Sequence, residues 1–78
     1  MSEFKFWKTT KKFKEFQILE SIKNKPKITQ KELADNVNIS KGMINRYLHN
    51  LIDEDYVYEE KNKKKLTNSG RKLYHNLS

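Results

Sequence analysis

Hydrogen-bond donors gather in residues 40–50, whose sequence is SKGMINRYLHN. On a helical wheel of about 100° per residue, Asn45, Arg46 and His49 fall on one face, and the stretch holds no acidic residue. Arg can pair with guanine, Asn with adenine, and Lys with guanine or phosphate. A helix that only packs against a core does not need such a face, so the stretch is a candidate for contact with bases. The candidate residues are Ser40, Lys41, Gly42, Asn45, Arg46, His49 and Asn50.

The residues around this stretch predict two short helices joined by a tight turn. Thr29 and Glu32 form a T-x-x-E capping box, so the first of these helices is expected to begin at Gln30. Asn38 tolerates a left-handed backbone and is expected to end it, and Ser40 is a favourable N-cap for the second helix. Apolar residues recur at helical spacing in both helices: Leu33, Ala34 and Val37 in the first, and Ile44, Leu48 and Leu51 in the second.

A second basic stretch, after these helices, predicts a β-hairpin. Residues 56–60, YVYEE, are typical of a strand with Val57 inward, and Leu66 starts the return strand. Residues 61–65, KNKKK, are expected to form the turn between them. A lysine run is usually a solvated loop, but its place at a hairpin tip in a basic chain favours contact with a DNA backbone or minor groove. This predicted wing tip contains Lys61, Asn62, Lys63, Lys64 and Lys65.

Taken in order, these residues resemble a helix-turn-helix motif. Ala34, Asn38 and Ile44 stand where the motif usually carries a small residue, a turn glycine and a buried aliphatic residue. The chain beyond the motif resembles the winged form found in small MarR-like regulators of bacteria and archaea, where L-T-x-x-G-R comes after the wing. Residues 66–71 of this chain are LTNSGR. The chain departs from the family pattern at Asn38 and Asp55, where many relatives carry glycine.

The resemblance covers about residues 13–77 and implies a mainly α-helical fold with a small β-hairpin, the winged helix-turn-helix. It implies a transcriptional regulator that binds double-stranded DNA sequence-specifically, with residues 40–50 in the major groove. It places Thr29 and Gln30 beside phosphates, and it implies a homodimer that reads two half-sites. Two other functions stay open: a winged-helix module that binds another protein, and a winged helix that binds RNA.

We expect residues 1–78 to form one domain. Its predicted segments are an aromatic N-terminal arm at 1–8, a first helix at 9–24 capped by Thr9 or Thr10, the helix-turn-helix at 29–54, the wing at 56–67 and a C-terminal helix at 68–78. In the arm, Phe4 and Phe6 alternate with charges as in a strand, but the arm could also extend the first helix backward. Its aromatic residues either pack on the chain itself or form a dimer arm. Residues 27–28 could add a third strand to the wing.

Composition narrows the function classes further. The net charge of +7 favours a polyanionic partner, although a lysine- and asparagine-rich chain is also expected from an AT-rich genome. The chain has no cysteine and no apolar run of the length of a membrane span, and its start lacks the apolar core of a signal peptide, so a cytoplasmic location is expected. His49 and His75 have no neighbours at metal-ligand spacing. No catalytic motif occurs, so we expect no enzyme, cofactor, metal or small-molecule ligand.

Overall fold

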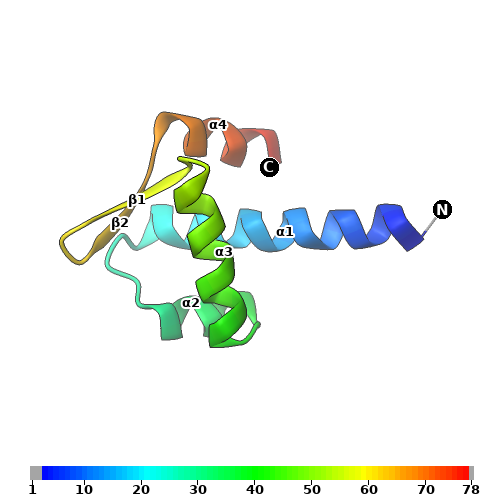
Figure 1. The fold of residues 1–78 in the computed structure, drawn as a ribbon, viewed down its shortest axis with the longest axis horizontal. Coiled ribbons are helices and arrows are strands. Elements are labelled where there is room, and N and C mark those ends of the chain that lie inside the picture. Colours follow the sequence, from blue (N-terminus) through cyan, green and yellow to red (C-terminus); the bar gives the residue numbers. More distant parts are fainter. Residues whose placement is uncertain (1–2, 78) are drawn as a thin grey trace.

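The computed structural model describes residues 3–77, and the side chains of residues 11–77. The order is α1 (Glu3–Asn24), α2 (Gln30–Val37), α3 (Lys41–Asp53), β1 (Val57–Glu60), β2 (Lys63–Leu66) and α4 (Asn68–Leu77). Helix α3 crosses in front of α1, α2 lies below, α4 lies above, and the hairpin projects to one side (Figure 1). The two strands are antiparallel, with Val57 opposite Leu66 and Glu60 opposite Lys63. This is the mainly helical fold with a small hairpin that the sequence predicted.

One continuous core joins all the elements. Ile18, Leu19 and Ile22 of α1 are buried in one cluster with the inward residues of α2 and α3. The hairpin adds Val57 and Leu66 to the same cluster. The remaining buried apolar residues are Ile28, Leu33, Val37, Ile44, Leu48 and Leu51. The helix-turn-helix and the hairpin are therefore anchored in one core rather than in two.

The first helix is longer than predicted. It begins at Glu3 instead of Thr9, so the expected start at residue 9 is wrong and the alternative of a backward extension is confirmed. Nothing in residues 3–10 breaks a helix, because the stretch contains neither Gly nor Pro. Thr9 and Thr10 consequently lie inside the helix and do not cap it. The N-terminal part of α1 runs beyond the rest of the fold (Figure 1). The predicted packing of the aromatic arm concerns side chains outside the described part of the chain.

The predicted ends of α2 and α3 are confirmed. Thr29 and Glu32 form both hydrogen bonds of the capping box at the start of α2. Asn38 ends α2 with a left-handed backbone, φ 61°, and Ser40 caps α3 by accepting a hydrogen bond from the backbone N–H of Met43 at 3.2 Å. Asp55 also has a left-handed φ, 63°. Both residues thus take the left-handed backbone at the two positions where the resembled family often has glycine, and short polar side chains tolerate that conformation.

The hairpin is tighter than the sequence indicated. Its turn consists of residues 61–62 alone, with Lys61 at φ 58°, so the prediction of a turn from 61 to 65 is wrong. Residues 63–65 instead belong to β2. Among residues 3–77 the sheet has two strands, and the link at residues 27–28 is not a third. The neighbouring Pro26 contacts the wing through one backbone hydrogen bond, from Lys64 N–H to its carbonyl at 2.8 Å.

Candidate nucleic-acid interface

The polar face predicted for α3 is open to solvent. Asn45, Arg46 and His49 are exposed, while Ile44 and Leu48 on the opposite side are 0% and 4% exposed. The other candidate residues of this face, Ser40, Lys41, Gly42 and Asn50, are exposed as well. A helix with donors on one side and a buried apolar back can enter a B-DNA major groove without disturbing the core.

The start of α2 lies against this face. The Gln30 Nε2 donates a hydrogen bond to Asn45 Oδ1 at 3.1 Å, which joins two candidate residues from different helices. Asn45 keeps its amide N–H groups for an outside acceptor. Thr29 is engaged in the predicted capping box: its N–H donates to Glu32 Oε1 at 3.0 Å, and its Oγ1 accepts from Glu32 N–H at 3.1 Å. Its hydroxyl proton is the group left for a phosphate.

The wing presents a basic edge. Lys61, Asn62, Lys63 and Lys65 are exposed, but Lys64 is only 9% exposed. The placement of Lys64 at a solvated tip is therefore wrong. In a strand, alternate side chains point to opposite faces, so the residue two before the inward Leu66 must also point inward. The inward Leu66 and the alternation of β2 together place Lys64 inward, although a run of identical lysines does not distinguish Lys64 from its neighbours.

Two lysines of α1 lie beside the polar face of α3. Lys11 and Lys14 line a shallow hollow together with Arg46 and Asn50 of α3. The Lys14 ammonium donates to the carbonyl of Val37 at 2.8 Å and so helps to hold the end of α2. Lys11 is exposed and adds positive charge next to Arg46. The sequence alone does not place these lysines next to Arg46, because their proximity depends on how α1 packs across α3.

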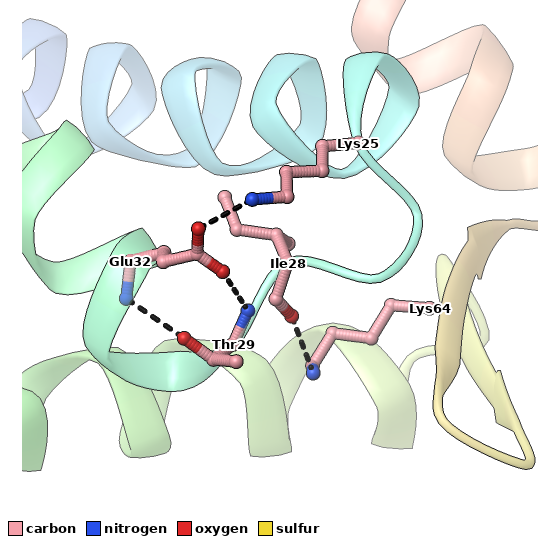
Figure 2. Close-up of polar contacts among 5 residues, drawn as sticks. All are labelled: Lys25, Ile28, Thr29, Glu32 and Lys64. Carbon is pink, nitrogen blue, oxygen red and sulfur yellow. Dashed lines mark hydrogen bonds and ion pairs between the residues drawn. The ribbon is translucent and has the colours of Figure 1, made fainter.

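A polar network fixes the link between α1 and α2. The Lys25 ammonium pairs with Glu32 Oε2, and the other Glu32 oxygen accepts from the backbone N–H of Thr29 (Figure 2). The hydrogen bond from Lys25, followed by the backbone hydrogen bond from Thr29, lowers the pKa of Glu32 from 4.5 to about 2. The start of α2, and with it Gln30 beside the α3 face, is held in place by this carboxylate.

The network predicts an acid-dependent part of the stability. Because the folded-state pKa of Glu32 lies below its unfolded value, its contribution is present above about pH 4.5 and is lost as the pH falls toward 2. We expect Glu32→Gln to lower the melting temperature at pH 7 and to differ less from the wild type as the pH falls through this window. Thermal melts from pH 7 to pH 2 measure the difference in melting temperature between the two proteins. A difference that stays constant over this range would contradict the stabilising role of the ionised Glu32.

Within residues 3–77, no helix has both the length and the apolar character that a bilayer crossing needs. The described residues also bring no three metal-ligating side chains together.

A family model for winged helix-turn-helix DNA-binding domains matches residues 14–58 of the chain. The match spans more than half of the 78 residues, so the chain belongs to the winged helix-turn-helix DNA-binding family. It covers α2, α3 and most of the core-forming part of α1. The predicted class of protein and its fold are thereby confirmed.

Among solved structures, the fold is similar to several MarR-family proteins. A MarR family protein of Mycobacterium tuberculosis is 26% identical with a TM-score of 0.69, over 82% of this chain and 49% of that one. The reduced form of MarR from E. coli is 26% identical with a TM-score of 0.68, over 81% and 48%. A MarR transcriptional regulator from Methanosarcina mazei is 30% identical with a TM-score of 0.62, over 82% and 51%. This chain thus spans about half the length of these structures. No curated protein sequence matches the chain.

Proposed function

We propose that the protein is a transcriptional regulator that binds double-stranded DNA sequence-specifically, with α3 in the major groove. The observation that carries the proposal is the exposed donor face of residues 40–50, a stretch without an acidic residue, above a buried apolar back. Arg46 has the geometry to pair with guanine and Asn45 with adenine. Lys41 and Gly42, in the first turn of α3, allow a close approach to the DNA backbone.

The wing supports the same proposal on electrostatic grounds. Lys61, Lys63 and Lys65 reach solvent from a hairpin that projects beside the helix-turn-helix (Figure 1). Cations there would lie along the phosphate backbone or in the adjacent minor groove while α3 occupies the major groove. Each phosphate that is neutralised releases counterions, and the net charge of +7 favours encounter with a polyanion.

We also propose that the protein acts as a homodimer in the cytoplasm. Two-fold symmetry lets two copies of α3 read two half-sites one helical turn apart. The N-terminal part of α1, which extends beyond the rest of the fold, is the surface we assign to pairing (Figure 1). Titrations of duplex DNA at protein concentrations well above the Kd would then saturate at two chains per site.

The test is fluorescence anisotropy of duplex DNA at several salt concentrations, first with mixed-sequence duplex and then with a site selected from random sequence. We expect micromolar or tighter binding, and roughly a hundredfold weaker binding to the selected site after Asn45→Ala with Arg46→Ala, since one base pairing is worth about 1–3 kcal/mol. A matched control is Lys72→Ala with Asn76→Ala on α4, which removes one cation and one amide from exposed positions. This control should bind like the wild type.

Three results would contradict the proposal. No binding at low salt would favour a module that binds another protein, for which exposed Met43 and Ile52 on α3 offer apolar contacts. Tighter binding to structured RNA in direct competition would favour an RNA-binding winged helix. Equal losses in the α3 variant and its α4 control would indicate attraction by net charge alone.

A further inference from the structure

Lys64 differs from the other lysines of the wing because its ammonium lies inside the protein. The residue is 9% exposed, and its Nζ donates a hydrogen bond to the carbonyl of Ile28 at 3.1 Å (Figure 2). The Glu59 carboxylate on the neighbouring strand lies 3.8 Å from the same Nζ. Lysines are rarely buried unless their charge is paired, so this position has a specific role in the fold.

The same residue connects the wing to the α1–α2 link a second time. Its backbone N–H donates to the Pro26 carbonyl at 2.8 Å, so main chain and side chain both reach residues 26–28. That link is in turn fixed to α2 by the Lys25–Glu32 pair and the capping box (Figure 2). A continuous set of polar contacts therefore runs from β2 to the start of α2, which lies against the face of α3 through Gln30.

The hairpin needs such a connection. Its strands have four residues each, and a two-stranded hairpin of this size is marginal by itself. Val57 and Leu66 hold the base of the hairpin in the core, but the residues nearer the turn have no buried apolar side chain. Between the base and the turn, Lys64 attaches the hairpin to the body of the fold through two hydrogen bonds.

We propose that Lys64 is a positioning residue that sets the angle of the wing against α3, without itself touching DNA. The proposal rests on the proposed DNA-binding function only in its second test. The structural part of the proposal is that the Lys64 ammonium holds the Ile28 carbonyl. The functional part is that a correctly placed wing brings Lys61, Lys63 and Lys65 to phosphates at the same time.

The first test is hydrogen exchange of the protein alone. Lys64→Met keeps the aliphatic stem and removes the ammonium, whereas Lys65→Met makes the same change at an exposed neighbour. We expect Lys64→Met to speed exchange of the position-64 amide and of the Ile28 amide, which donates to the Lys25 carbonyl. Lys65→Met should leave both unchanged. Equal protection in the two variants would overturn the proposal, whether or not the protein binds DNA.

The second test is the salt dependence of binding to duplex DNA. A lysine that neutralises a phosphate contributes about 0.9 to the slope of log K against log salt. We expect Lys64→Met to weaken binding about tenfold, which is ~1.4 kcal/mol, and to lower the slope, because a displaced wing loses phosphate contacts of its exposed lysines. In a protein that already carries Lys61→Met, Lys63→Met and Lys65→Met, the same change at Lys64 should alter neither the affinity nor the slope. A further fall of about 0.9 in the slope of that protein would mean that Lys64 itself contacts DNA, and an unchanged affinity of the single variant would mean that Lys64 does not position the wing. Either result would overturn the proposal.

A milder variant separates the loss of the Lys64 hydrogen bond from a general loss of folding. Lys64→Gln retains an N–H donor on a shorter side chain, and it should restore part of both the amide protection and the affinity. Thermal melts establish that each variant is folded at the temperature of the measurements. If the Gln variant is as defective as the Met variant while both remain folded, the hydrogen bond to Ile28 does not position the wing.

Discussion

Replacing Gly70 with alanine is expected to lower the melting temperature by at least about 10 °C, or to prevent folding. An ideal Cβ at this position would lie 2.0 Å from the carbonyl oxygen of Tyr56 and 2.9 Å from its carbonyl carbon. Both atoms belong to the backbone, so no side-chain rotation can relieve the overlap. Overpacking of this kind costs roughly 3 kcal/mol or more, and one kcal/mol corresponds to about 4–8 °C in a domain of this size.

The close approach arises from the junction between the wing and α4. Thr67 N–H donates to the Tyr56 carbonyl at 3.0 Å, and the Thr67 hydroxyl accepts from Gly70 N–H at 3.0 Å to cap α4. Moving α4 outward to admit a methyl group would break the first of these bonds and lift Leu73 and Tyr74 from the core that they partly cover. The stability loss therefore combines strain with lost packing.

Gly42 offers a matched control in the same protein. It also lies in a helix, but an added Cβ there meets nothing within 4 Å. Alanine has the higher helix propensity, so Gly42→Ala should stabilise the protein by roughly 0.5–1 kcal/mol. Differential scanning calorimetry of the two variants without DNA should show shifts of opposite sign. Similar shifts in both would show that helix propensity, rather than the approach to Tyr56, governs position 70.

These two glycines show what the sequence could and could not supply. The pattern LTNSGR, which contains Gly70, resembled the segment that comes after the wing, but the reason for a glycine there is its close approach to Tyr56, 14 positions earlier in the chain. Helix ends were predictable because capping is local: the Thr29–Glu32 box and the Ser40 cap depend on residues three apart. Contacts between distant segments have no comparable local signature.

The wing lysines illustrate the same limit within the candidate site. Residues 63–65 are chemically identical, so composition could not separate the buried Lys64 from its exposed neighbours. The register of β2, set by the inward Leu66 opposite Val57, makes the distinction. Likewise, the start of α1 at Glu3 could not be placed, because alternating aromatic and charged residues fit a strand as well as a helix. The polar face of α3 was predictable, since a single helical period defines it.

Reversing the charge of the exposed wing lysines is expected to weaken DNA binding by at least about a hundredfold near physiological salt. Three phosphate contacts, each contributing about 0.9 to the salt slope, account for a loss of this size when they are removed, and glutamates add repulsion. Lys61→Glu, Lys63→Glu and Lys65→Glu together lower the net charge by two each, from +7 to +1. The slope should fall by about 2.7.

The matched control carries the same net charge at other places. Lys12→Glu, Lys23→Glu and Lys72→Glu alter exposed positions on α1 and α4, and they also lower the net charge from +7 to +1. Long-range attraction is thus reduced equally in both triple variants, while the wing contacts are lost in only one. We expect the control to keep most of the salt slope. If the two proteins bind duplex DNA alike across the salt series, the wing makes no phosphate contacts, and binding depends on α3 and overall charge.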